Sequence, residues 1–460
     1  MNPALISEPS SYRDPSGFIF NKNGVLYRQV NRSFAEHFDH FISSGCYDHL
    51  VKNKLLIPHE TIEENFSEDN KWHCTLKPEV VPFISYPYEW TFGMLREAAL
   101  LTITLAKEAM RFGMMLKDAS AYNIQWHKGR MIFIDTLSFE KYDEQKPWIA
   151  YRQFCEHFLG PLLLMHYRKL PLTEMLLAWP DGIPLSVNSA LLPRRSRFSL
   201  PVYLHIHLHA KYSTKTAGKE KRSFQFSKKK MEHLLNSLEQ LVQRLKIPEK
   251  ESAWSAYYDE ASQRKDYLEN KKAIITEWLP QFFDVKTAVD LGANDGEFSK
   301  LVSAKDIFTI ATDADPYCID RLYRSIRNNQ TNLQPLVNDL SHPSPAIGVN
   351  NKERTAFTDR AKAGLVMALA LIHHLAIGKN IPLEKIAAFF SDLSRKWLIV
   401  EFVPGTDEKI IQMLQDKKDI YDQYTQENFE NIFRGHFDIR DKKLIADSGR
   451  TIYLMKKHGE

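Results

Sequence analysis

The alternation of apolar strands with amphipathic segments in the second half of the chain constrains its fold more than any other feature. The apolar runs are TAVDL from residue 287, IFTIATD from 307, AGLVMALALI from 363 and KWLIVEFV from 396. Strands that alternate with helical segments predict a parallel α/β sheet. Two strand-like runs then follow within GHFDIRDKKLIADSGRTIYLMKK, joined through Asp447-Ser448-Gly449, and predict a terminal antiparallel hairpin.

A turn with two glycines follows the first of these strands. Gly292 and Gly296 stand where the strand passes into a helix, and glycine lets the backbone approach a nucleotide closely. A dinucleotide fingerprint has glycine at three positions of this turn, but Asn294 and Glu297 occupy the second and third here. The turn therefore predicts a nucleotide-type cofactor and disfavours NAD.

The ordered set of polar residues around these strands resembles the class I S-adenosylmethionine-dependent methyltransferases over about residues 254–460. The set comprises the Asp-x-Gly-x-x-x-Gly turn, Asp313 after the second strand, Asn338-Asp339 after the third and ALALIHHL after the fourth. The resemblance implies a Rossmann-like sheet that binds S-adenosyl-L-methionine. The cofactor-binding residues that it implies are Asp290, Gly292, Ala293, Asn294, Gly296, Asp313, Asn338 and Asp339.

The same resemblance assigns roles to the acidic residues. Asp290 would help to hold the methionine ammonium group through the turn, and Asp313 would accept hydrogen bonds from the ribose hydroxyls. Asn338 and Asp339 would meet the adenine amino group. The alternative is that these residues only cap and turn the chain in an α/β domain that has lost its cofactor.

The candidates for catalysis follow the fourth and fifth strands. His373 and His374 come after the fourth strand and Glu401 ends the fifth, so all three are expected at the sheet edge where open α/β sheets bind ligands. Either histidine is a candidate general base, and Glu401 would orient it or contact the substrate. Packing or capping by the histidines, a structural Glu401, and a metal site made of the three residues remain as alternatives.

Polar residues in the first half of the chain suggest a second fold. Asp118 and Asn123 have Asp-x-x-x-x-Asn spacing, and a Gly129-Arg130 turn then leads into MIFI and Asp135. The region resembles the catalytic loop and metal-binding Asp of protein-kinase-like and aminoglycoside-phosphotransferase-like folds. That resemblance implies that Asp118 is the base and that Asn123 and Asp135 hold magnesium on ATP phosphates.

The N-terminal region also departs from the kinase pattern. Leu116 stands where a His is usual, Thr136-Leu137 replaces Phe-Gly, and Gly17 and Gly24 are poor substitutes for a glycine-rich loop. Arg28 is the candidate for the strand lysine. We therefore expect a kinase-like fold that is degenerate in phosphoryl transfer.

Three histidines lie at alternate positions in YLHIHLHA. His205, His207 and His209 would share one face if that run is a strand, which could ligate a metal. No fourth ligand is identifiable nearby, so packed or hydrogen-bonded histidines are the favoured interpretation and no metal site is predicted.

These motifs divide the chain into three parts. We expect a kinase-like α+β domain at 1–210, a basic linker and helix at 211–250, and a methyltransferase domain at 251–460. Basic residues concentrate at 193–197 and 211–230, which could form one surface that attracts anions but could also be a solvated linker. Trp254, Tyr257, Tyr258 and Tyr267 precede the first strand as core or lid residues.

Composition excludes several classes of protein. The 61 basic and 57 acidic residues give a net charge of +4, too even for attraction of the whole surface to nucleic acid or anionic lipid. The four cysteines are far apart, which predicts reduced thiols. The N-terminus lacks a basic start followed by an apolar run, and the most apolar stretches are shorter than the roughly 20 residues that span a bilayer.

We therefore expect a cytoplasmic enzyme with a small-molecule or glycan substrate, without a nucleic-acid or membrane partner. The combined motifs resemble bacterial nodulation-protein-related methyltransferases. Methyl transfer from S-adenosyl-L-methionine is the predicted activity. A bifunctional kinase and methyltransferase, or a scaffold that binds the cofactor without catalysis, are the alternatives.

Overall fold

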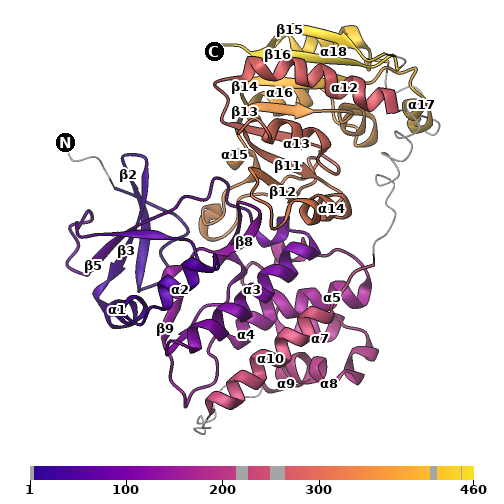
Figure 1. Ribbon diagram of the computed structural model, residues 1–460. Helices are drawn as coiled ribbons and strands as arrows, with labels where there is room; N and C mark the ends of the chain where they lie inside the picture. Colours follow the sequence, from indigo (N-terminus) through magenta and orange to yellow (C-terminus); the bar gives the residue numbers. More distant parts are fainter. Residues whose placement is uncertain (1–4, 214–225, 249–264, 415–421, 447, 460) are drawn as a thin grey trace. The chain divides into compact units, whose positions relative to one another are not determined.

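The chain forms two compact units. Figure 1 shows the computed structural model, which describes residues 5–213, 226–248, 265–414, 422–446 and 448–459. The first unit comprises Met1–Pro248 with Gly348–Arg354, and the second comprises Glu249–Ile347 with Thr355–Glu460. Part of the basic linker, and Trp254, Tyr257 and Tyr258, lie outside the described residues.

The first unit begins with a five-stranded antiparallel sheet in the order β1-β2-β3-β5-β4. Asn23 and Gly24 form the two-residue turn between β2 and β3, and both have positive φ (55° and 78°). An Asn-Gly turn of this kind matches the twist of a hairpin, so Gly24 has a structural explanation that involves no phosphate. The strands are β1 (Ile6–Ser7), β2 (Gly17–Lys22), β3 (Val25–Asn31), β4 (His59–Ile62) and β5 (Trp72–Pro78).

The rest of the first unit is mainly helical and surrounds the 19-residue helix α3 (Phe92–Met110). Thr91 caps this helix by accepting a hydrogen bond from the Met94 amide at 3.2 Å. Two small two-stranded antiparallel sheets pair β6 with β9 and β7 with β8, and the second of these is a hairpin. The other elements are α1 (Ala35–Ser43), α2 (Cys46–Lys52), β6 (Met114–Leu116), β7 (Ile124–His127), β8 (Arg130–Phe133), β9 (Phe139–Lys141), α4 (Tyr151–Phe154), α5 (Gly160–Arg168), α6 (Met175–Ala178), α7 (Leu185–Leu191) and α10 (Lys228–Arg244).

The run YLHIHLHA is helical, which removes the strand on which a shared histidine face depended. α8 (Leu200–Val202), the π-helical turn η7 (Tyr203–Leu208) and α9 (His209–Ser213) follow one another without a break. Val202, Ile206 and Ala210 recur at four-residue spacing and are all buried. The buried face of this segment is therefore formed by apolar residues at helical spacing. The histidines at every second position do not define it.

The second unit contains a seven-stranded sheet in the order β12-β11-β10-β13-β14-β16-β15 (Figure 1). The first five strands in this order, β12, β11, β10, β13 and β14, are parallel to one another, and β16 is antiparallel to both of its neighbours. The predicted parallel sheet and terminal hairpin are confirmed. The strands are β10 (Thr287–Leu291), β11 (Phe308–Asp313), β12 (Leu333–Val337), β13 (Ala363–Ala368), β14 (Ser394–Phe402), β15 (Phe437–Leu444) and β16 (Thr451–Lys457).

The sheet order places a topological switch between β10 and β13. From β10 the chain proceeds outward to β11 and β12 and then crosses back to β13, so the connections on the two sides diverge. Ligands of open α/β sheets bind outside the carboxyl ends of the strands at such a point. The helices are α12 (Lys265–Trp278), α13 (Glu297–Ser303), α14 (Pro316–Ile326), α15 (Phe357–Arg360), α16 (Leu383–Leu393), α17 (Glu408–Leu414) and α18 (Gln426–Phe433).

Apolar side chains from β10, β13, β14 and β16 join those of α12 and α13 in one core of the second unit. Trp278, Ile275 and Leu454 in this core are essentially inaccessible to solvent. Within the described ranges, every helix is too short or too polar to traverse a lipid bilayer.

Candidate functional site

The turn between β10 and α13 has the backbone conformation that its glycines predict. Gly292, Asn294 and Gly296 all have positive φ, between 50° and 76°. The amides of Gly292 and Ala293 both donate to the Thr312 carbonyl, at 2.9 and 3.0 Å, which ties the turn to β11. A Cβ at position 292 would lie 3.2 Å from the Leu371 side chain, so only glycine fits without displacement.

Asp290 lies near the end of β10, directly before this turn, and has almost no exposed surface. Its Oδ2 accepts a hydrogen bond from the Ser299 hydroxyl at 2.5 Å, which links β10 to α13. Burial raises the pKa of Asp290 to about 6, while the Ser299 hydrogen bond acts in the opposite direction.

Asp313 connects the ends of two strands. Its Oδ2 accepts from the Asn294 amide at 2.9 Å, and its Oδ1 accepts from the Asp315 amide at 2.9 Å. The side chain therefore holds the glycine turn against the end of β11. Asp315, which belongs to no sequence motif described above, caps α14 through Oδ1, and its buried Oδ2 has no hydrogen-bond partner among the described residues.

Asn338 and Asp339 follow β12 at the same edge. Asn338 Oδ1 accepts from the Ser344 amide at 3.2 Å, whereas its buried Nδ2 has no partner within the described residues. Asp339 accepts from the Ser341 amide and hydroxyl and lies 3.5 Å from Lys379 Nζ. Although partial burial opposes the change, the Ser341 hydrogen bonds and the Lys379 charge lower the pKa of Asp339.

His373 and His374 follow β13, and their ring centres lie 3.9 Å apart. His373 is 1% exposed, and neither ring nitrogen has a partner in the described part of the chain. Burial lowers the pKa of His373 well below 6.5 and that of His374 to about 4. Both imidazoles are therefore neutral at neutral pH.

Glu401 is fully buried in a network of charged and hydroxyl groups. Its Oε1 accepts from the Tyr267 hydroxyl at 2.6 Å, and its Oε2 lies 2.7 Å from Lys271 Nζ. Arg450 lies 3.6 Å from Oε1 and pairs with Asp407 at 2.8 Å. Burial by itself raises the pKa of Glu401, but the charges of Lys271 and Arg450 lower it further, so the net shift is downward and the carboxylate is ionised.

Glu401 and Tyr267 are candidates from the sequence, whereas the structure adds Lys271, Arg450 and Asp407 to them. Lys271 is nine-tenths or more buried and lies about 5 Å from the centres of two aromatic rings, Tyr267 and Phe298. A buried lysine with a carboxylate partner cannot be identified from its position in an amphipathic helix. The network depends on the pairing of β14 with β16, which is a long-range feature.

In the first unit, the structure brings together the three residues of the Asp-Asn-Asp pattern. The Ser138 hydroxyl donates to Asp135 at 2.5 Å and lies 3.4 Å from Asn123 Nδ2. Burial and, secondarily, the Asp135 charge raise the pKa of Asp118. Arg28 on β3 pairs with Asp135 at 2.5 Å, so a guanidinium already neutralises the carboxylate expected to bind magnesium.

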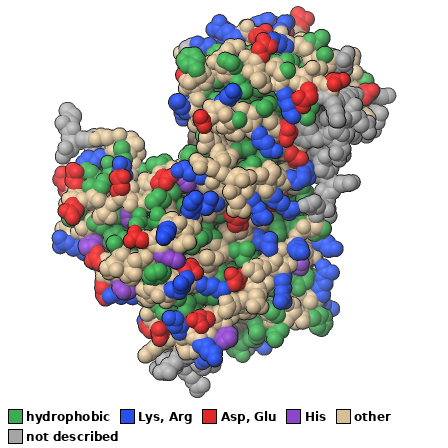
Figure 2. Space-filling model, viewed as in Figure 1, with side chains coloured by type: hydrophobic (Ala, Val, Ile, Leu, Met, Phe, Trp, Pro, Cys, Tyr) green, Lys and Arg blue, Asp and Glu red, His purple; other side chains and the backbone are tan. Residues whose placement is uncertain are grey.

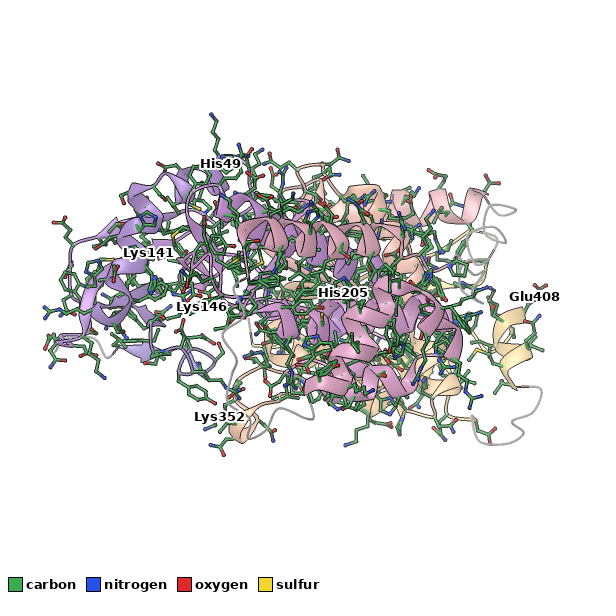
Figure 3. All side chains as sticks on the ribbon, turned by 90° about the horizontal axis from the view of Figure 1, so that it is seen from below. His49, Lys141, Lys146, His205, Lys352 and Glu408 are labelled. Atoms are coloured by element: carbon green, nitrogen blue, oxygen red, sulfur yellow. The ribbon has the colours of Figure 1, made fainter. Side chains whose placement is uncertain are left out.

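The three histidines of η7 and α9 have partners other than metals. His205, labelled in Figure 3, hydrogen-bonds the hydroxyls of Tyr151 and Ser237 at 2.7 and 3.0 Å. His207 bonds the hydroxyls of Ser189 and Ser196, and His209 stacks on the Tyr151 ring. No group of three or more His, Cys, Asp or Glu side chains suited to a metal occurs within the described residues.

Comparison with known proteins identifies the family. No protein family model matches the chain. The nodulation protein NoeA of Rhizobium meliloti (strain 1021) is 31% identical over 458 residues, which covers 97% of this chain and 95% of that protein. The chain belongs to the NoeA family. The sequence resemblance to nodulation-related proteins is thereby confirmed, whereas a kinase-like N-terminal region stays a prediction.

Several solved structures with partial similarity to this NoeA-family chain are methyltransferases. The magnesium protoporphyrin IX methyltransferase of Synechocystis PCC 6803 with bound SAH has a TM-score of 0.30 and 14% identity, over 42% of this chain and 86% of that chain. The N-methyltransferase NodS of Bradyrhizobium japonicum WM9 has a TM-score of 0.30 and 10% identity, over 40% and 96%. Scores this low do not establish an activity.

Proposed function

We propose that the second unit transfers a methyl group from S-adenosyl-L-methionine to a small-molecule or glycan acceptor. The observation that carries the proposal is the concentration of polar residues at the carboxyl ends of β10 to β14, in a sheet ordered β12-β11-β10-β13-β14-β16-β15. This edge contains the switch point at which open α/β sheets bind ligands.

The residues at this edge fit the cofactor. Buried polar atoms are normally hydrogen-bonded, yet Asn338 Nδ2 and Asp315 Oδ2 have no protein partner among the described residues. A donor beside β12 suits an adenine ring, and a carboxylate oxygen beside β11 suits ribose hydroxyls, so Asp315 joins Asp313 as a candidate. Gly292 keeps the backbone surface free of a Cβ. When bound, S-adenosyl-L-methionine supplies a methyl group that a nucleophile displaces from sulfur.

The chain's own residues then provide orientation and proton removal. His373 is the stronger candidate base, because its ring is neutral and both of its nitrogens lack a partner in the described residues. His374 is neutral as well and lies directly against it. Glu401 is a poor base, because two cations and a hydroxyl hold its carboxylate in the ionised form, and we assign it a positioning role.

We further propose that the N-terminal unit is kinase-like in fold and does not transfer phosphate. The support is the Arg28–Asp135 pair, since a magnesium ion would have to displace the guanidinium from Asp135. The alternatives are a bifunctional kinase and methyltransferase and a scaffold that binds the cofactor without catalysis.

The proposed activity is tested with purified full-length protein and S-adenosyl-L-methionine that carries a labelled methyl group. Fractions of bacterial extract enriched in glycans, small metabolites, proteins or RNA serve as acceptors. We expect label in the glycan or small-metabolite fraction, lost in Asp313→Ala and retained in Asp392→Ala, which changes an exposed carboxylate on α16. Label in RNA or protein would overturn the acceptor class, and cofactor binding without transfer would favour the scaffold.

A further inference from the structure

A patch of the first unit combines exposed apolar side chains with arginines. Phe198 is 90% exposed and Leu200 is 66% exposed, and Tyr203 and Leu204 are also exposed. Three exposed arginines, Arg194, Arg195 and Arg197, precede them in the chain. We call residues 194–204 the basic-apolar patch. Figure 2 shows hydrophobic and basic side chains next to one another on the lower part of this unit.

The patch begins on the short 3₁₀ helix η6 (Arg194–Phe198) and continues on α8 and η7, where it is the outward side of a helical segment whose inward side already has its core contacts. Val202 and Ile206 are buried, whereas Leu200 and Leu204, four residues apart, lie together on the exposed side. Exposing two leucines and a phenylalanine to water gives no stability to an isolated fold. Contiguous exposed apolar surface of this kind marks a site of interaction.

The charge of the chain segment that carries the patch is of one sign. No Asp or Glu occurs between Asp181 and Glu220, while Arg194, Arg195, Arg197, Lys211, Lys215 and Lys219 lie in that interval. Within the described residues, no carboxylate forms a salt bridge with the three arginines. Arg195 donates to the Tyr167 carbonyl at 2.8 Å, which fixes its backbone neighbours against α5. The partner must therefore be anionic and also accept apolar side chains.

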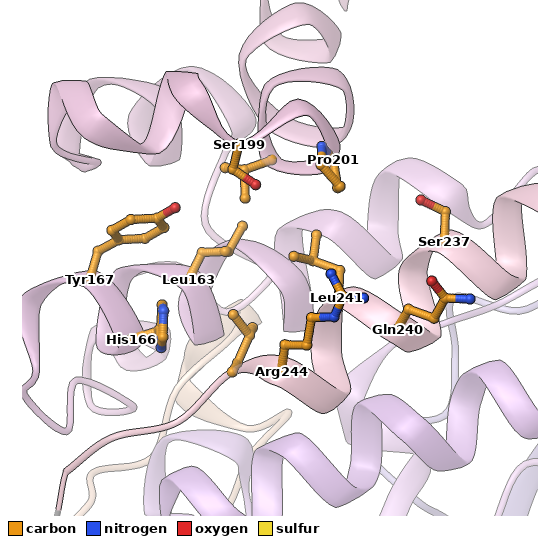
Figure 4. Close-up of a pocket in the computed structure, with 11 residues that line it drawn as sticks. Leu163, His166, Tyr167, Ser199, Pro201, Ser237, Gln240, Leu241 and Arg244 are labelled. Atoms are coloured by element: carbon orange, nitrogen blue, oxygen red, sulfur yellow. The ribbon is translucent and has the colours of Figure 1, made fainter.

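A pocket of about 230 Å³ adjoins the patch (Figure 4). Ser199 and Pro201 of the patch line it, together with Leu163 and Leu241. Arg244 and His166 lie among the lining residues as well, so the pocket offers both apolar walls and cationic or polar groups. This combination suits an amphipathic molecule with an anionic head.

We propose that the basic-apolar patch docks the protein onto the surface of an anionic phospholipid bilayer. Apolar side chains that enter the boundary between headgroups and acyl chains, next to basic residues that meet anionic headgroups, are the physical requirements for such binding. Phe198 and Tyr203 could stack on nucleotide bases, but Leu200 and Leu204 have no π-face, and their exposure is explained by entry into an apolar phase rather than by single-stranded RNA. A second copy of the chain would bring the same positive charge to the contact, which disfavours a symmetric dimer.

This inference goes beyond methyl transfer and does not depend on it. It also differs from the expectation of no membrane partner, which came from the nearly even charge of the whole chain. The patch is local, and docking at a bilayer surface requires no helix that crosses the membrane.

The test is co-sedimentation of the full-length protein with vesicles. One set contains phosphatidylcholine alone, and the other an equimolar mixture of phosphatidylglycerol and phosphatidylcholine. We expect binding to the anionic set only, weakened by salt. Arg194→Glu with Arg197→Glu should weaken it about 25-fold or more, because each basic residue near an anionic surface contributes about fivefold. Phe198→Ser with Leu204→Ser should weaken it about tenfold.

A matched control changes one exposed basic and one exposed apolar residue elsewhere in the same unit. Lys52→Glu with Ile149→Ser should bind like the unchanged protein, since Ile149 is 68% exposed outside the patch. The proposal is overturned by absence of binding to anionic vesicles, or by equal loss in the control. It is also overturned if Phe198→Ser with Leu204→Ser leaves vesicle binding intact while the unchanged protein binds a labelled single-stranded RNA more tightly than it binds anionic vesicles. Dissociation of a dimer by the same variant, measured by light scattering, would overturn it as well.

Discussion

Replacement of Glu401 by Gln separates a structural role from a catalytic one. Glutamine keeps the size of the side chain and an oxygen that can accept from Tyr267, but it removes the charge that faces Lys271 and Arg450. Arg450 retains its pair with Asp407. Lys271, whose side chain is only 3% exposed, loses its carboxylate partner at 2.7 Å.

The geometry sets the size of the effect. Removal of one member of a buried ion pair costs about 3–5 kcal/mol, because the other charge remains desolvated and unpaired. Since Asp407 and Tyr267 keep their contacts with Arg450, we expect the lower end, about 3 kcal/mol, which is roughly a hundredfold in the opening equilibrium of the second unit.

Hydrogen exchange measured by mass spectrometry on full-length protein can follow this unit alone. Peptides from β13, β14 and β16 should lose protection in Glu401→Gln, whereas Glu384→Gln, at an exposed position of α16, should leave protection unchanged. If Glu401→Gln abolished methyl transfer with unaltered protection, the structural assignment would be wrong and Glu401 would be a catalytic residue.

The same pair predicts a pH dependence. The pKa of Glu401 is lowered in the folded protein from its ordinary value of 4.5, so ionised Glu401 contributes stability above that value. The contribution is lost as pH falls through the lowered folded pKa. The difference in protection between the unchanged protein and Glu401→Gln should therefore shrink progressively below pH 4.5.

Three further outcomes are expected. Gly292→Ala should destabilise the second unit by about 1–3 kcal/mol and weaken cofactor binding in calorimetry, because φ is 75° and the new Cβ meets Leu371; unchanged affinity would remove the turn from the site. Since the folded pKa of Asp290, about 6, lies above its ordinary 3.8, its contribution favours unfolding above pH 6, so Asp290→Asn should raise the thermal midpoint at pH 7; a lowered midpoint would contradict that sign. Magnesium and ATP should not shift the thermal midpoint, because Arg28 pairs with Asp135; a shift abolished by Asp135→Ala would establish a nucleotide site.

Local sequence patterns were sufficient for the sheet of the second unit but not for the network behind its edge. Alternating apolar runs and the Gly292 turn determine strands and switch point, because they depend on periodicity and backbone conformation. Lys271, Arg450 and Asp407 carry no local signal, since their burial follows from tertiary packing.

The helical YLHIHLHA run shows a second limit of local patterns. The alternating histidines satisfy a strand pattern, whereas Val202, Ile206 and Ala210 satisfy a helical pattern. The segment is a helix because the apolar residues pack in the core. Hydroxyl partners for His205 and His207 come from separate helices and from η6 (Arg194–Phe198). Nothing in the run itself indicates those partners.

Calorimetric titration of the full-length protein with S-adenosylhomocysteine tests the central claim most directly. We predict saturable binding at one site, weakened at least tenfold in Asp313→Ala, which loses the carboxylate that joins the glycine turn to β11, and unchanged in Asp392→Ala. Absence of binding by the unchanged protein, or equal affinity in Asp313→Ala, would contradict a cofactor site at the carboxyl edge of the sheet.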